Sequence, residues 1–324
     1  MRILWQRRLR KLPAMTQDGE VAAEPRSSSR GSRPKIGITA GDPAGIGPEI
    51  ADKAARDPRV LEVCEPVLYG AATGSAMPIG RISAAAGQAA YDAIVRAVED
   101  ARQERIAAIA TAPINKEAFA AAGIPWRGHT DLLAHLTGAR RIAMMFHADV
   151  LRVVLATVHI PLGEVPHALT QERLRETIEL TADEMPRFGF PQPRLAVAGL
   201  NPHAGEHGLM GLEEDAVIRP AIAASRERGV LVEGPYPADT IFLRAMRGEF
   251  DVVIACYHDQ GLIPVKLAAF GRAVNVTLGL PIVRTSVDHG TAFDIAGRGI
   301  ADPSSLVHAV LLAASLAVGR TARA

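Results

Sequence analysis

Three histidines stand where a metal site could form. His159, His203 and His258 each end or follow a short apolar run that favours a β-strand, and each has Gly, Asn or Asp nearby. Neutral imidazoles are good ligands for zinc and similar divalent ions, and a three-histidine site leaves one position open for a substrate oxygen. The sequence therefore predicts a divalent metal site. Since the spacing matches no local metal motif, a purely structural role for each histidine stays open.

A second group of residues has the chemistry of an anion site. Gly128 and the two residues after it open a predicted helix, and helix N-termini, cations and hydroxyls bind phosphate or carboxylate. Apolar residues flank the two cations Lys266 and Arg284. We expect each to have a buried partner, because an unpaired buried cation is costly. The group consists of His129, Thr130, Lys266, Asn275 and Arg284.

Two loops are rich in glycine. The first, residues 39–49, follows a predicted strand and opens a helix, but its spacing is neither that of a dinucleotide fingerprint nor that of a P-loop. It could equally be a turn that closes a βα unit, with Pro48 in the first helical turn. The second loop, residues 288–303, leads into the last predicted helix. It is either a ligand-embracing loop or a long surface loop.

Strand-like and helix-like segments alternate from Pro34 onward. This alternation predicts an α/β protein with a largely parallel sheet, whose ligands gather at the carboxyl ends of the strands. We expect strands at 35–39, 106–111, 142–146, 152–157, 194–199, 252–256 and 273–277. We expect helices at 48–56, 84–102, 116–121, 170–188, 212–227 and 304–317.

Composition excludes several classes of protein. The chain has 324 residues, of which 48% are hydrophobic, 22% charged and 4% aromatic. Such a chain is neither a disulfide-built miniprotein nor a disordered or collagen-like one. Its two cysteines, Cys64 and Cys256, lie far apart, which indicates a reducing compartment and leads us to expect the cytoplasm. No apolar run is long enough for a membrane span, and the near-neutral charge argues against a nucleic-acid partner.

The charge is divided unevenly. Residues 1–33 carry eight Lys or Arg and three Asp or Glu, so the remaining residues have a net charge of −4. This first stretch has no apolar period, and its Ser- and Arg-rich end has the composition of a linker. We expect residues 1–33 to form a disordered basic leader. A transit peptide, a basic arm or a later start at Met15 are the alternatives.

The chain from about Lys35 to its last helix resembles the 4-hydroxythreonine-4-phosphate dehydrogenase family of pyridoxal phosphate biosynthesis. The resemblance rests on motifs in a fixed order along the chain. They are Gly41-Asp-Pro-Ala-Gly-Ile-Gly-Pro-Glu49, Ala112-Pro-Ile-Asn-Lys116, Gly128-His-Thr130, His159-Ile-Pro-Leu162, Asn201-Pro-His-Ala-Gly-Glu206, Gly234-Pro-Tyr-Pro-Ala-Asp-Thr240, Tyr257-His-Asp-Gln-Gly261 and residues 278–292.

The resemblance implies a two-domain fold like that of isocitrate and isopropylmalate dehydrogenases, with a cleft between mostly parallel α/β domains. The terminal domain would comprise residues 34–127 and 276–324, and the central domain residues 128–275. The protein would be a homodimer that binds a small phosphorylated substrate.

The family's site residues can be carried over one by one. His159, His203 and His258 would hold one divalent ion (Zn, Mg or Co) across the dimer interface. His129, Thr130, Lys266, Asn275 and Arg284 would hold the substrate. The closing loop would hold NAD or NADP through His289, Gly290, Thr291, Ala292 and Asp294.

The resemblance also implies the reaction, in which NAD oxidises a secondary alcohol and the resulting β-keto acid loses carbon dioxide. For 4-hydroxythreonine 4-phosphate the product is 3-amino-2-oxopropyl phosphate. A divalent ion suits this chemistry because it acidifies the alcohol. A base must take the alcohol proton, and Asp259 and Asp239 are our candidates.

Some features leave other functions open. The segment between Tyr69 and Ile82 is shorter than the family leads us to expect. Parts of the wording also resemble a related branch that acts on D-threonate or D-erythronate 4-phosphate. A phosphate acyltransferase on a related fold, or an inactive binding protein, are more distant alternatives, and neither needs three metal-binding histidines.

Overall fold

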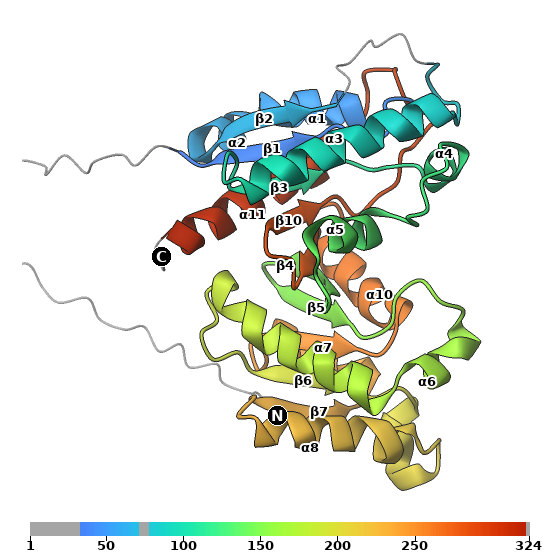
Figure 1. Cartoon of the computed structure of the whole chain (residues 1–324). Coiled ribbons are helices and arrows are strands. Elements are labelled where there is room, and N and C mark those ends of the chain that lie inside the picture. The colour runs from blue at the N-terminus through green and yellow to red at the C-terminus, as the bar shows by residue number, and fades with distance from the viewer. Residues whose placement is uncertain (1–32, 71–77, 322–324) are drawn as a thin grey trace, which may run out of the picture. The chain divides into compact units, whose positions relative to one another are not determined.

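The computed structural model describes residues 33–70 and 78–321, and within them ten strands form one continuous sheet (Figure 1). The strand order is β2-β1-β3-β10-β9-β4-β5-β8-β6-β7. The strands are β1 (Lys35–Thr39), β2 (Glu65–Tyr69), β3 (Ala108–Thr111), β4 (Ala143–Ala148), β5 (Leu151–Leu155), β6 (Leu195–Ala198), β7 (Val232–Tyr236), β8 (Val252–Ala255), β9 (Val274–Leu278) and β10 (Val283–Ser286).

Helices connect most of these strands and cover both faces of the sheet. The α-helices are α1 (Gly47–Ala55), α2 (Pro58–Val63), α3 (Ala84–Arg102), α4 (Lys116–Ala121), α5 (His129–Thr137), α6 (Val165–Ala168), α7 (Gln171–Glu184), α8 (Arg219–Glu227), α9 (Ala238–Met246), α10 (His258–Ala269) and α11 (Ser304–Thr321). The expected α/β class with a mostly parallel sheet is confirmed.

The sheet reverses direction in its middle. The pairs β10 with β9, β9 with β4, and β4 with β5 are antiparallel, whereas all the other pairs are parallel. The strands β2, β1, β3 and β10 and the strands β5, β8, β6 and β7 therefore form two parallel sets, which β9 and β4 join by antiparallel pairing.

Alternate residues of each strand serve opposite faces of the sheet. In β5, Val154 packs in the larger core, which includes side chains of α1, α7, α8 and α11, while Val153 and Leu155 pack in the core beneath α9 and α10. In β3, Ile109 faces a third core formed with α3 and α5. The period of two in each strand thus sets which helices it can bury.

Helix α10 packs unusually close to the sheet. A Cβ atom on Gly261 would lie 2.6 Å from Leu155 Cδ2, so only glycine permits this approach between α10 and β5. Pro264, which removes one backbone donor, also lies inside this helix. Both residues argue against a helix in the sequence, and for this reason α10 was missed.

Several expectations concern parts of the chain that the structure does not describe. The basic leader, residues 1–33, lies outside the described residues except for Arg33, as does most of the segment predicted to be shortened, namely residues 71–77. The described part belongs to a compact unit that begins at Arg33, and its division into two domains stays a prediction. No helix among the described residues is long and apolar enough to cross a membrane.

His147 makes the stability of the fold depend on pH. Burial and the nearby Arg152 lower the pKa of His147 to about 4, and its ring stacks on Phe188 with 5.7 Å between centroids. The unfolded chain therefore binds a proton below about pH 6.5 that the folded chain takes up only near pH 4. Stability is lost as the pH falls through this window.

The His147→Gln variant is expected to lose less stability on acidification than the unchanged protein. The difference between the two, measured by urea unfolding at pH 7 and pH 5, should be about 2 kcal/mol. His167→Gln is the matched control, since His167 is exposed. Equal losses in His147→Gln and the unchanged protein would show that His147 is not the sensor.

Candidate active site

Two of the three predicted metal ligands lie side by side. His159 follows β5, His258 begins α10 after the neighbouring strand β8, and their ring centroids are 5.5 Å apart. His258 Nδ1 lies 2.7 Å from Asp259 Oδ1. With the carboxylate as acceptor, Nδ1 carries the proton and Nε2 keeps its lone pair. This arrangement fits an imidazole that binds a divalent ion.

His203 lies on a strained segment after β6. Its φ is 52°, and Ala204, Glu206 and His207 also have left-handed backbones. Such residues cost of order 1 kcal/mol each and gather at functional sites. Glu214 holds the start of the segment, accepting hydrogen bonds from the backbone N–H and the side-chain amide of Asn201. Among the described residues no group of three metal-ligand side chains forms within one chain.

Arg284 is a buried cation without a buried anion. It is only 3% exposed, and its guanidinium donates to the hydroxyls of Thr111 and Thr277, but it forms no ion pair with any described residue. Burial lowers the pKa of Arg284 to about 9. Burying a guanidinium without a carboxylate is costly, which points to an anionic ligand as its missing partner.

Unsatisfied polar atoms gather around Arg284. His129 Nε2 and Asn275 Oδ1 are buried without a hydrogen-bond partner among the described residues. Asn275 pairs across the sheet with Ser286, two residues after Arg284. Burial, and then the charge of Arg284, hold the pKa of His129 well below its usual range. Buried polar atoms are almost always satisfied, so these atoms indicate a place for a polar ligand.

The start of α5 adds backbone donors to this place. Its N-cap is Gly128, and no side chain caps the helix. The free N–H groups of the first turn, which contains His129 and Thr130, favour an anion. Lys266 differs from expectation: it is exposed on α10 rather than buried, because its part of the helix faces outward. Of the two cations expected to be buried, only Arg284 is.

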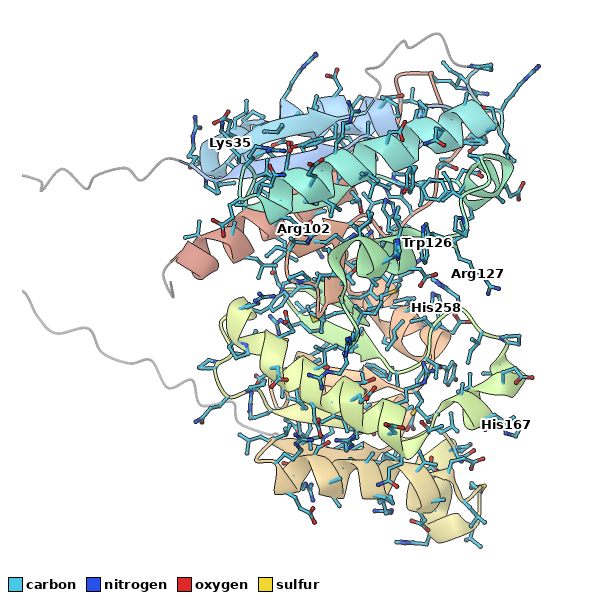
Figure 2. The ribbon with its side chains drawn as sticks, viewed as in Figure 1. Lys35, Arg102, Trp126, Arg127, His167 and His258 are labelled. Atoms are coloured by element: carbon cyan, nitrogen blue, oxygen red, sulfur yellow. The ribbon has the colours of Figure 1, made fainter. Side chains whose placement is uncertain are left out.

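His159 joins the two groups. Burial and the charges of Lys116 and His258 lower its pKa, and Asp131 opposes them. Lys116 begins α4, and Asp131 lies in the first turn of α5, next to His129 and Thr130. Figure 2 shows His258 at a level between Trp126 and Arg127, which precede α5, and His167 on α6. The pair of His159 and His258 and the start of α5 therefore share one region.

The two glycine-rich loops pack against each other. The Ile46 N–H donates to the Thr291 carbonyl, and a Cβ atom on Gly45 would lie 2.8 Å from that oxygen. The backbone N–H groups of residues 290–294 donate to no described residue, and Ala292 is left-handed. Free backbone donors in a strained loop suit a phosphate-containing cofactor. Asp42 lies in the first loop, and its buried Oδ2 also has no described partner.

Glu49 fastens the second loop to α1. Its side chain is almost fully buried and accepts hydrogen bonds from the N–H groups of Gly299 and Ala301 and from Lys53 Nζ. The Glu49→Ala variant is expected to lose about 2 kcal/mol of stability, because the buried N–H of Ala301 and the part-buried N–H of Gly299 are left unpaired. It should also raise about tenfold the KM for NAD, the cofactor that the family resemblance leads us to expect, since the loop is freed.

Urea unfolding and cofactor titration measure the two effects of Glu49→Ala. Asp52→Ala is the control, because Asp52 lies on the same helix and forms only an exposed ion pair with Arg56. If Glu49→Ala bound the cofactor as the control does, the loop would not be part of the cofactor site.

The two candidate bases differ in their surroundings. Asp259 is engaged with His258, which favours an orienting role over that of a free base. Asp239 is exposed in the first turn of α9 and forms no hydrogen bond or ion pair with a described residue. The sequence reasoning missed Thr111, Thr277, Asp42, Asp131 and the role of Lys116. Of these residues, only Lys116 has a position that could have indicated a role, because it follows a buried strand and the helix cap Asn115.

Comparison with known proteins identifies the family of this chain. The family model described as pyridoxal phosphate biosynthetic protein PdxA matches residues 36–313. A 4-hydroxythreonine-4-phosphate dehydrogenase of Desulforapulum autotrophicum is 46% identical over an alignment covering 87% of this chain and 95% of the relative. A D-threonate 4-phosphate dehydrogenase of Cupriavidus necator is 45% identical, with 89% and 98% covered.

A solved structure agrees with these relatives. The 4-hydroxythreonine-4-phosphate dehydrogenase of Klebsiella pneumoniae superposes with a TM-score of 0.81 at 40% identity, covering 89% of this chain and 99% of the other. These relatives are dehydrogenases, which supports an oxidoreductase. With the family model spanning most of its length, the chain belongs to the PdxA family of pyridoxal phosphate biosynthetic proteins.

Proposed function

We propose that this protein is a dehydrogenase that uses NAD and a divalent metal ion to oxidise 4-hydroxythreonine 4-phosphate and then releases carbon dioxide. The observation that carries the proposal is Arg284, a buried cation with no anion, in the same region as the His159 and His258 pair. A phosphorylated substrate supplies the missing anion. The pair of His159 and His258 then lies close to the rest of the substrate.

The anion end of the site has its parts in place. Arg284 can donate to two phosphate oxygens, and its pairing with Thr111 and Thr277 fixes the guanidinium plane. His129 Nε2, with its low pKa, and the N-terminus of α5 complete the surroundings of the phosphate. Lys266, being exposed, can reach the substrate only from the open side.

The donor set near His159 fits a divalent ion. His159 and His258 supply two imidazoles, and Asp259 fixes the tautomer of His258. A bound divalent ion would acidify the substrate alcohol and stabilise negative charge on its oxygen. Residues 289–294 would hold NAD, since their backbone donors are free and Glu49 fastens their loop to α1.

The third histidine would come from a second copy of the chain. Ile263, Leu267 and Phe270 are 59%, 84% and 83% exposed and share one face of α10, the helix that begins with His258. Leu209, Met210 and Leu212, near His203, are exposed as well. Exposed apolar patches of this kind mark protein interfaces. Both patches adjoin a predicted metal ligand, which supports a homodimer with shared metal sites.

The substrate is tested by measuring NADH with each candidate in the presence of Zn, Mg or Co. We expect turnover with 4-hydroxythreonine 4-phosphate and none with the same compound lacking its phosphate. D-threonate 4-phosphate is the second candidate, because the Cupriavidus necator relative is similar to this chain in nearly equal measure. Absence of NADH with every phosphorylated substrate, or full activity after chelation of the metal, would overturn the proposal.

A further inference from the structure

Lys116 is placed to reach both halves of the candidate site. It is the first residue of α4, which residues 112–115 connect to β3, and the Asn115 side chain caps the helix by accepting from the Ala118 N–H. Its side chain extends toward the start of α5, because a Cβ atom on Gly128 would lie 3.9 Å from Lys116 Cε. The charge of Lys116 also acts on the ring of His159. Its ammonium group therefore lies between the start of α5 and the pair of His159 and His258.

The ammonium group of Lys116 is unengaged and open to water. It forms no hydrogen bond or ion pair with any residue the structure describes, and its side chain is exposed. Lys53 offers the contrast: its ammonium donates to Glu49 and to the carbonyls of Gly299 and Ala301. Lys53 serves the fold, whereas Lys116 has no such task. A free ammonium in this place can bind or protonate a ligand.

The proposed reaction needs a proton donor at its last step. When the β-keto acid breaks its bond to the carboxyl carbon, carbon dioxide leaves and the electron pair remains as an enolate. The carbon that lost carbon dioxide must then form a bond to hydrogen. Asp259 is already engaged with His258, and the imidazoles of His159 and His258 would be committed to the metal. A lysine ammonium carries only donors and can pass one proton to a carbon base.

We propose that Lys116 is the catalytic acid that protonates the carbon from which carbon dioxide has left. This role rests on the proposed function and adds a residue to it. One proton passes from Lys116 Nζ to the enolate carbon, the carbonyl group is restored, and Lys116 becomes a neutral amine. Exposure to solvent then lets water return the proton. Because the lysine approaches from one side, the proton reaches one face of the enolate.

The test follows the reaction in deuterium oxide with Lys116→Met, Lys116→Arg and the unchanged protein. The unchanged protein should give product with one deuterium of a single handedness at the new CH₂ group. Lys116→Met should give both hands equally, as should Lys116→Arg, which keeps the charge but is a far weaker acid. The steady-state turnover rate should fall about 100-fold in both variants. The rate of NADH formation in the first turnover should fall less than about tenfold.

Controls separate this role from others. Lys35→Met, which removes an exposed ion pair with Glu65, should behave like the unchanged protein. Samples are quenched in acid at short times, and handedness is read by NMR of a chiral derivative. Single-handed product from Lys116→Met, or a raised KM with unchanged turnover and handedness, would overturn the assignment. If the unchanged protein formed no NADH with any candidate substrate, the proposed function itself would fail.

Circular dichroism and metal binding establish that the Lys116 variants are folded. Should Lys116→Met fail to fold, Lys116→Arg carries the test alone, because it preserves length and charge. In that variant single-handed product would overturn the proposal, and product of both hands would support it.

Discussion

The His258→Ala variant is expected to lose tight binding of a divalent ion and to show a kcat/KM about 1,000-fold or more below that of the unchanged protein. The reason is geometric. His258 supplies one of the two imidazoles that lie 5.5 Å apart. Asp259 contacts its Nδ1 and so fixes the direction of its Nε2. Removing His258 would leave a bound ion without one nitrogen ligand, and such an ion would contribute several kcal/mol to the transition state. Isothermal titration with Zn or Co and an NADH assay measure the two effects.

His167→Ala is the matched control for His258→Ala. His167 is an exposed histidine on α6, and no described residue pairs with it. It should bind metal and turn over substrate as the unchanged protein does. Undiminished metal affinity in His258→Ala would show that the ion, if any, binds elsewhere.

The Arg284→Met variant is expected to lose activity without losing stability. Methionine has a similar length and removes the uncompensated buried charge, so the ligand-free protein should unfold at a higher temperature or at an unchanged one. The same change would remove the proposed main partner of the substrate phosphate. We expect kcat/KM to fall 100- to 1,000-fold, mostly through KM, because a charge-assisted bidentate contact is lost.

Thermal unfolding without ligand and steady-state kinetics measure the two effects of Arg284→Met. Arg141→Met is the control, since Arg141 is exposed and pairs with Glu179 and Asp183. A large loss of stability together with an unchanged KM would mean that Arg284 serves the fold and not the substrate.

Much of the fold follows from local patterns in the sequence. β1, α3 and α4 have the predicted bounds, because their apolar periods and the caps Ser83 and Asn115 are local signals. Three strands were missed for physical reasons. β2 contains Pro66, which an edge strand tolerates, β7 contains Gly234 and Pro235, and β10 is built of Val-Arg-Thr-Ser, which looks like a polar loop. β10 is buried only because Arg284 and its neighbours find polar partners across the sheet.

The site was less predictable than the fold. The sequence identified His159, His258, His129, Asn275 and Arg284 as candidates, and the structure brings them into two adjoining groups. It did not reveal the reversal of the sheet at β9 and β4, where antiparallel pairs join two parallel sets of strands. Nor did it reveal that Lys266 is exposed, because flanking apolar residues such as Leu267 themselves face outward. Spacing along the chain carries little information on such long-range pairing.

In the proposed dimer, each metal site is built from two copies of the chain. Mixing two inactive variants, His203→Ala and His258→Ala, tests it most directly after partial unfolding and joint refolding. In a hybrid dimer with shared sites, one site collects both alanines and the other keeps all three histidines. Random pairing then restores about a quarter of the activity of the unchanged protein. If the mixture stays as inactive as either variant alone, although hybrid dimers form, the histidines do not share a site between subunits.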